Sequence, residues 1–127
     1  MNLLIIGGAG YIGSHIVLEA INYGFSVTVF DDLSTGSKDN LDSNVQFIQG
    51  STLSVSDLSN LFRVREFDVV IHLAASKAAG ESMVYPERYS RNNIIGSLNL
   101  LNVITEHKIK AFVFSSTAAV YGYPQYP

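Results

Sequence analysis

Short apolar runs alternate along this chain with segments in which apolar residues recur every three or four positions. Continuous runs are typical of strands buried on both faces of a parallel sheet, and the longer period is that of an amphipathic helix. The pattern predicts strands at 2–6, 26–30, 45–49, 68–73 and 111–115. It predicts helices at 11–22, at 55–65 and from 86 to about 107.

The segments between these elements are rich in polar and turn-forming residues, which predicts loops. Ser54 or Ser56 is the expected N-cap of the second helix, and Gly24 is the expected C-cap glycine of the first. Strands that alternate with helices predict an α/β domain with a doubly wound parallel sheet. The predicted loops cover 31–44, with one helical turn, then 74–85, and finally YGYPQYP at 121–127.

The composition is that of an ordinary globular protein of one domain, with 127 residues, 47% hydrophobic and 15% charged. A net charge of −3 without a basic cluster argues against a nucleic-acid partner. The chain has no cysteine, and its apolar start is too short for a signal peptide or a membrane span. We therefore expect a cytoplasmic protein with no membrane contact. His15, His72 and His107 share no metal-ligand spacing, so no metal site is predicted.

Three glycines, Gly7, Gly10 and Gly13, lie between the first strand and the first helix. A dinucleotide-binding turn needs one glycine for the tight turn, a second for approach of the pyrophosphate and a third for helix packing. Asp31 lies about 20 residues further on, where a carboxylate binds the adenosine ribose and repels the 2′-phosphate of NADP. This arrangement favours NAD. The alternative is a turn that binds nothing, with Asp31 capping a loop.

The spacing G-x-x-G-x-x-G and a set of further motifs carry a family resemblance. The motifs GGAGYIGSH, DDLSTG, VIHLAA, SKAAGES, NNIIGSLNLL and FSSTAAVYG fall in the order of the extended short-chain dehydrogenase/reductases. Together they resemble the UDP-glucose (UDP-galactose) 4-epimerases along essentially the whole chain. The resemblance implies a Rossmann-type fold, bound NAD, a UDP-sugar substrate, and reversible hydride transfer from sugar C4 through a 4-keto intermediate.

The resemblance also implies roles for particular residues. Those expected at the pyrophosphate are Gly7, Gly10, Tyr11, Ile12 and Gly13. Those expected at the adenosine are Asp31, Asp32, Leu33, Ser34, Thr35, Gly36, Ser51 and Thr52. Those expected along the rest of the cofactor are Leu73, Ala74, Ala75, Lys77, Asn92 and Ser115. Thr117 is the expected catalytic residue, whose hydroxyl orients or relays a proton beside a tyrosine base.

Two positions depart from the family pattern. Ser51 stands where the family carries an acid at the adenine amino group, so a hydroxyl replaces a charge. No tyrosine is followed four residues later by a lysine, although Y-x-x-x-K is the family's catalytic pair. We therefore expect 1–127 to be an incomplete NAD-binding domain, truncated after about the fifth strand, and to be inactive on its own.

The sequence leaves three interpretations open. The chain is part of a sugar-nucleotide 4-epimerase, part of another epimerase or reductase of the same family, or a non-catalytic dinucleotide-binding module. A dehydratase is disfavoured, because Ala118 and Ala119 stand where the dehydratases carry an acidic pair.

The predicted helix at 86–107 carries more apolar residues than one sheet face needs. A stripe along it comprises Ile94, Leu98, Leu101 and Ile104. In the related enzymes the equivalent helix contributes to a dimer, so a homodimer through this helix is expected. The alternative is that Leu100 and its neighbours simply cover the sheet.

Overall fold

The computed structural model describes residues 1–123. All strands pair in parallel in the order β3-β2-β1-β4-β5, which confirms the predicted α/β class and the parallel sheet. Residues 124–127, part of the expected C-terminal loop, lie outside the described residues. The strands are β1 (Asn2–Ile6), β2 (Ser26–Asp31), β3 (Gln46–Gln49), β4 (Val69–His72) and β5 (Ala111–Phe114).

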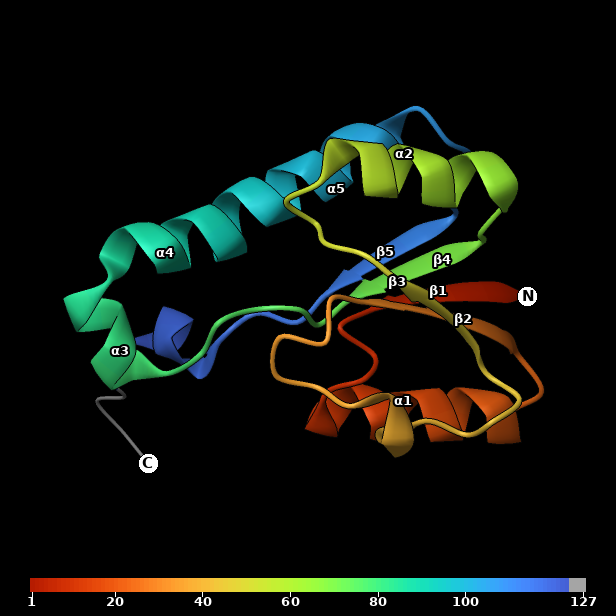
Figure 1. Ribbon diagram of the computed structural model, residues 1–127, viewed down its shortest axis with the longest axis horizontal. Coiled ribbons are helices and arrows are strands. Elements are labelled where there is room, and N and C mark those ends of the chain that lie inside the picture. Colours follow the sequence, from red (N-terminus) through yellow and green to blue (C-terminus); the bar gives the residue numbers. More distant parts are fainter. Residues whose placement is uncertain (124–127) are drawn as a thin grey trace.

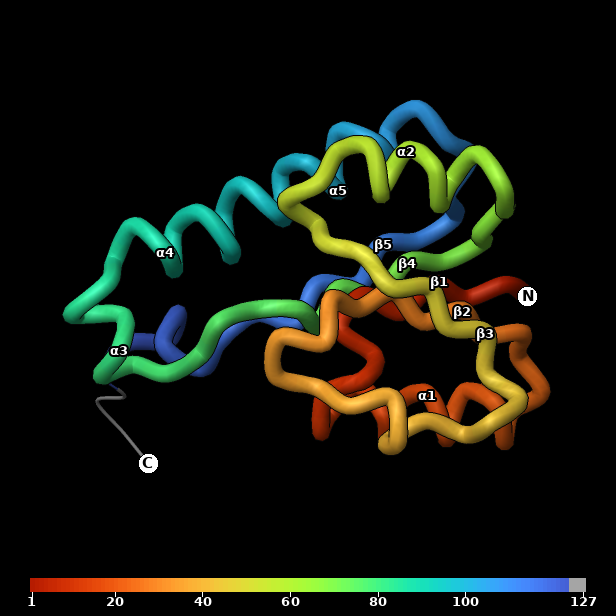
Figure 2. The backbone as a smooth tube through the Cα atoms, in the orientation of Figure 1, coloured from red at the N-terminus to blue at the C-terminus, as the bar shows by residue number. Residues whose placement is uncertain are grey.

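Helices cover both faces of this sheet (Figure 1). One face carries α1 (Tyr11–Asn22), and the other carries α2 (Val55–Val64) and α5 (Gly96–Thr105). Beyond the edge of the sheet, an arm is formed by α3 (Ala79–Val84), α4 (Pro86–Ser90) and a π-helical turn (Arg91–Ile95) that runs into α5 (Figure 2). Two 3-10 turns complete the described chain, at Lys38–Asn40 and Ala118–Tyr121.

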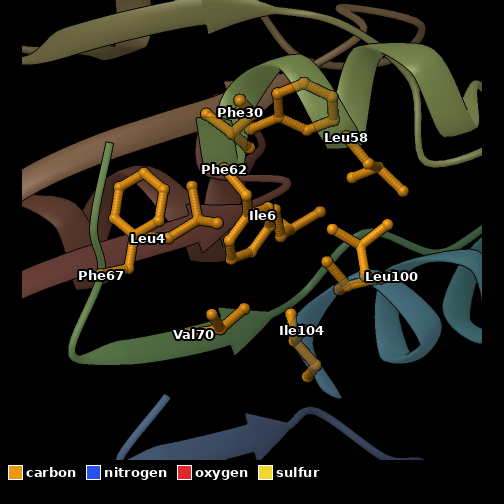
Figure 3. Packing of buried hydrophobic residues seen from close by; sticks show 11 residues of the cluster. Leu4, Ile6, Phe30, Leu58, Phe62, Phe67, Val70, Leu100 and Ile104 are labelled. Carbon is orange, nitrogen blue, oxygen red and sulfur yellow. The ribbon is translucent and has the colours of Figure 1, made fainter. Parts of the chain in front are cut away.

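The larger core lies between the sheet and the helices α2 and α5 (Figure 3). Leu4 and Ile6 of β1 meet Leu58 of α2 and Leu100 of α5 there, and each of the four is at most 1% exposed. Burying one such side chain stabilises the fold by about 1.5–3 kcal/mol. The intervening Ile5 belongs to a second core under α1. Alternate residues of β1 therefore serve both cores, which explains its unbroken apolar run.

Most element ends agree with the sequence pattern. The hydroxyl of Ser54 accepts a hydrogen bond from the N–H of Asp57 (3.2 Å), so Ser54 rather than Ser56 is the N-cap of α2. The C-cap residue of α1 is Tyr23, and Gly24 follows it with a φ of +78°, the left-handed conformation common just after a helix C-cap. The helical turn expected inside 31–44 is the 3-10 turn at Lys38–Asn40.

The prediction of a loop throughout 74–85 is wrong, because α3 occupies part of it. A helix of 6 residues is too short to show a helical period in the sequence. The long helix predicted after Pro86 is present, but its middle is π-helical and its last residue is Thr105.

Of the apolar stripe predicted on that long helix, Ile104 is buried in the core, but the other three residues are exposed. Ile94 and Leu98 are 58% and 52% exposed, whereas Leu100 is fully buried. Both faces of the helix carry apolar residues at helical spacing, so periodicity alone does not select one. Packing against α2 and the sheet selects the face that carries Leu100, Val103 and Ile104.

Within residues 1–123, the structure contains no helix with the length and apolar character needed to cross a bilayer.

Candidate dinucleotide site

A cavity of about 290 Å³ lies where the carboxyl ends of the central strands meet the first residues of α1. The strand order reverses beside β1, since β2 and β3 lie on one side and β4 and β5 on the other. In open parallel sheets this reversal opens the crevice in which ligands bind. We call this space the first cavity.

Most residues predicted to bind the cofactor line the first cavity. They are Gly7, Gly10, Tyr11, Ile12, Gly13, Asp31, Asp32, Ser34, Thr35, Thr52, Leu73, Ala74, Ala75, Lys77 and Asn92. Four further lining residues were not predicted, namely Ile6, Phe30, Gly50 and Ser76. Each of these four belongs to, or closely follows, the carboxyl end of a strand, a signal that the predicted topology already contained.

The glycine turn brings three chain segments closer together than side chains allow. Gly7 has a φ of +81°, and a Cβ on it would lie 2.7 Å from the backbone nitrogen of Ala74. A Cβ on Gly13 would lie 2.3 Å from the carbonyl oxygen of Gly7, so α1 packs directly on the turn. The tight turn and the close helix packing predicted for these two glycines are therefore present.

The N-terminus of α1 opens onto the first cavity. Its N-cap is Gly10, which has no side chain to cap the helix, and its first turn contains no acidic residue. The first helical hydrogen bond runs from the N–H of Ser14 to the oxygen of Gly10 (2.9 Å). The N–H groups of Tyr11, Ile12 and Gly13 precede it and have no helical acceptor. Together with the helix dipole, they form an anion-binding end.

Asp31 ties the glycine turn to the loop that follows β2. Its Oδ2 accepts a hydrogen bond from the N–H of Ala9 (3.0 Å), and its Oδ1 accepts one from the N–H of Leu33 (2.8 Å). Leu33 adopts a φ of +61°, a rare conformation for a leucine. Each carboxylate oxygen keeps lone-pair capacity toward the cavity, because an ionised carboxylate accepts about four hydrogen bonds.

The carbonyl oxygen of Ala9 holds the far end of the same loop. It accepts hydrogen bonds from the N–H of Ser37 (3.2 Å) and from Nδ2 of Asn40 (2.9 Å). Gly36 packs so closely here that a Cβ would lie 2.7 Å from this carbonyl oxygen. Leu33 and Gly36, both predicted to bind the cofactor, therefore lie outside the cavity lining and position the loop instead.

Ser51 and Thr52 follow β3 and play different parts. The Ser51 hydroxyl accepts a hydrogen bond from the N–H of Leu53 (3.3 Å), and Ser51 does not line the first cavity. Thr52 is buried and does line it. Ser51, which stands where the family carries an acid, thus stabilises the turn after β3 through its hydroxyl.

A second cavity of about 600 Å³ adjoins the first. The two share the segment 74–77, which includes Ser76 and Lys77. In Figure 2 the chain after β4 runs out beside the chain after β5, and residues of both segments line this cavity. Ser115 and Thr117, predicted as cofactor-binding and catalytic, line the second cavity rather than the first. The Thr117 hydroxyl accepts a hydrogen bond from the N–H of Ala119 (3.2 Å), which leaves its proton available to a ligand.

A carboxylate joins the two short helices on the outer side of the second cavity. Glu81 of α3 accepts hydrogen bonds from the hydroxyl of Tyr89 (2.6 Å) and from Nη1 of Arg88 (2.9 Å), both in α4. The hydrogen bond to Glu81 raises the pKa of the Tyr89 hydroxyl, because ionised tyrosine cannot donate it. Tyr89 therefore remains a donor and holds α4 against α3.

His72, the last residue of β4, is buried. Its Nε2 lies 2.9 Å from the hydroxyl of Ser97 in α5, and that hydroxyl donates to the carbonyl oxygen of Asn93 (2.6 Å). Because the Ser97 proton is used there, Nε2 carries the imidazole proton. Burial lowers the pKa of His72, so the ring is neutral in the folded chain. Among residues 1–123 no group of three or more metal-ligating side chains is clustered.

The reversal of strand order, the glycine turn and the acid after β2 define a dinucleotide-binding α/β domain. The sequence pattern of the NAD dependent epimerase/dehydratase family matches residues 3–127. The chain therefore belongs to that family, which confirms the family predicted from the sequence motifs.

Individual relatives are similar along nearly the whole chain. The bifunctional UDP-glucose 4-epimerase and UDP-xylose 4-epimerase 1 of Pisum sativum is 40% identical over 134 residues, which cover 97% of this chain and 38% of that protein. The UDP-glucose 4-epimerase of Halalkalibacterium halodurans is 45% identical over 124 residues, which cover 98% of this chain and 37% of that protein. The chain therefore spans well under half the length of the curated relatives it matches.

Solved structures show the same similarity. The Thermotoga maritima UDP-glucose 4-epimerase with UDP-glucose matches with a TM-score of 0.93 at 39% identity, covering 100% of this chain and 41% of that one. The Thermus thermophilus UDP-glucose 4-epimerase in complex with NAD matches with a TM-score of 0.89 at 35% identity, covering 92% of this chain and 38% of that one.

Proposed function

We propose that this chain forms the NAD-binding part of a UDP-sugar 4-epimerase, which interconverts UDP-glucose and UDP-galactose. The observation that carries the proposal is the meeting of the uncapped N-terminus of α1 and the Asp31 carboxylate at one cavity. The first offers N–H donors to a pyrophosphate, and the second offers acceptors to ribose hydroxyls. Family membership and the NAD and UDP-glucose complexes of similar structures support it.

The residues around the first cavity fit NAD better than NADP. Asp31 and Asp32 both line it, and Lys77 is the one basic residue among its lining within 1–123. A 2′-phosphate near these carboxylates meets repulsion without an arginine to compensate it. When bound, NAD accepts a hydride and returns it, while the residues of this chain hold and orient the dinucleotide.

Calorimetric titration of NAD into the purified 127-residue chain, with NADP as the control ligand, tests this proposal. We expect saturable binding that is tighter for NAD. Absence of NAD binding would overturn the proposal, and equally tight binding of NADP would overturn the role given to the two carboxylates.

We further propose that the chain alone does not turn over UDP-sugars, since it contains no Y-x-x-x-K pair to supply a tyrosine base. Thr117 then has a hydroxyl at the second cavity but no base beside it. An assay for conversion of UDP-galactose to UDP-glucose and of UDP-xylose, with an intact epimerase as positive control, checks this. Sustained turnover by the chain would contradict it.

The homodimer is also a proposal. Ile94, Ile95 and Leu98 are 58%, 49% and 52% exposed on the π-helical turn and the start of α5. An apolar face of this kind gains free energy when a second copy covers it. Sedimentation analysis should show a dimer that Leu98→Glu dissociates, whereas a monomer at all concentrations would contradict the proposal.

A further inference from the structure

The π-helical turn brings two consecutive asparagines against one serine of the wall between the cavities. Oδ1 of Asn93 accepts a hydrogen bond from the N–H of Ser76 (2.8 Å), and Nδ2 of Asn93 donates one to the Ser76 carbonyl (2.8 Å). The Asn93 side chain thus pairs with Ser76 as a neighbouring strand would. Both polar groups of the Ser76 backbone are satisfied by this one amide.

The neighbouring Asn92 bonds to the Ser76 side chain. Its Nδ2 lies 3.0 Å from the Ser76 hydroxyl oxygen and 3.3 Å from Oδ1 of Asn93. Because the Ser76 N–H identifies Oδ1 of Asn93 as an acceptor, the Asn92 atom facing it must be the donating nitrogen. The Ser76 hydroxyl therefore acts as an acceptor toward Asn92.

The proton of the Ser76 hydroxyl therefore remains available at the junction of the two cavities. The Ser76 hydroxyl has no acceptor for its own proton among residues 1–123, and Ser76 lines both cavities. A hydroxyl that accepts one hydrogen bond, on a residue whose backbone is held by two more, is a preorganised donor when its own proton is uncommitted. Lys77, the next residue, also lines both cavities.

We propose that Ser76 contacts the bound dinucleotide, donating a hydrogen bond to an oxygen acceptor on its nicotinamide half. This inference rests on the proposed function. The anion-binding end of α1 takes the pyrophosphate, and Asp31 on the β2 side takes the adenosine half. The other half then extends across the strand reversal toward β4, which Ser76 follows. Asn93 is a positioning residue, because it holds the backbone that carries the Ser76 hydroxyl.

Titration of NAD and of AMP into the 127-residue chain and its Ser76→Ala and Ser76→Thr variants tests this contact. Loss of one neutral hydrogen bond should weaken NAD binding by about three- to tenfold in Ser76→Ala. AMP, which carries only the adenosine half, should bind both proteins equally, and Ser76→Thr should keep most of the NAD affinity. Equal NAD affinity of wild type and Ser76→Ala would overturn the inference, as would an equal loss for AMP. If the wild type fails to bind NAD, the proposed function itself fails.

Asn93→Asp tests the positioning role. Aspartate keeps the acceptor for the Ser76 N–H but loses the donor to the Ser76 carbonyl. We expect a loss of NAD affinity similar to that of Ser76→Ala, unchanged AMP affinity, and no further loss in the double variant, because both changes remove one contact. Additive losses, or a parallel loss for AMP, would show a general structural role and contradict the assignment. Urea unfolding of each variant identifies any that do not fold.

Discussion

The two adjoining cavities are built in different ways. The first depends on close backbone packing at Gly7, Gly13 and Gly36, and the N–H and carbonyl of Ala9 join the glycine turn to Asp31 and the loop after β2. The second is walled by side chains, many of them hydroxyls, and its outer side depends on the contacts of Glu81 with α4. The difference teaches that a backbone-built site fails when a single Cβ is added, whereas a side-chain-built site changes step by step.

The largest effect should come from Gly13→Ala. The added Cβ would lie 2.3 Å from the Gly7 carbonyl, and backbone on both sides cannot yield. We expect destabilisation of roughly 3 kcal/mol and loss of NAD binding, measured by urea unfolding and calorimetry. Gly80→Ala is the matched control, since a Cβ there meets nothing within 4 Å. Similar unfolding midpoints for the two variants would contradict the close packing at Gly13.

Asp31→Asn should follow, because an amide cannot accept both N–H bonds. The buried N–H of Ala9 or that of Leu33 loses its acceptor, at a cost of about 2 kcal/mol. NAD affinity should fall with it. Asp42→Asn is the control, as the single bond from the N–H of Asn44 to Oδ1 survives that change. Unchanged unfolding of Asp31→Asn would mean that these bonds do not hold the loop.

Acidification should act through His72. Its folded-state pKa is lowered by burial, so below the unfolded-state value near 6.5 the unfolded chain binds more protons than the folded one. Stability is therefore full above that value and falls as the pH drops, by at most about 1.4 kcal/mol per pH unit. Urea unfolding between about pH 7.5 and about pH 5.5 measures this slope. His72→Gln should flatten it, and an equal slope in that variant would assign the effect to other groups.

The smallest effect should come from Glu81→Gln. The variant loses the charged partner of Arg88 and weakens the bond from Tyr89, but both lie at the outer side of the second cavity. Amide exchange over 79–84 should become faster by less than about tenfold, because exposed ion pairs contribute little. NAD affinity should not change. Tyr89→Phe, which removes the other partner, should give a similar result, and a drop in NAD affinity in either variant would show that the two cavities are not independent.

The first cavity was predictable from the sequence because local motifs build it. The glycines, Asp31 and the start of α1 lie within one β-α-β unit, and the predicted bounds of α1 are the observed ones. The second cavity was predicted only in part, because tertiary contacts form it. Ser76 was missed since its role depends on a π-helical turn 16 and 17 residues away, and helical periodicity does not reveal a π turn.

The shared segment 74–77 also bears on thermodynamics. A ligand that contacts this segment from one cavity changes the surface that a ligand in the other cavity meets. Any coupling between the two binding equilibria is reciprocal: whatever factor the first ligand adds to the affinity for the second, the second adds to the affinity for the first. These four residues are therefore where a ligand in one cavity affects a ligand in the other.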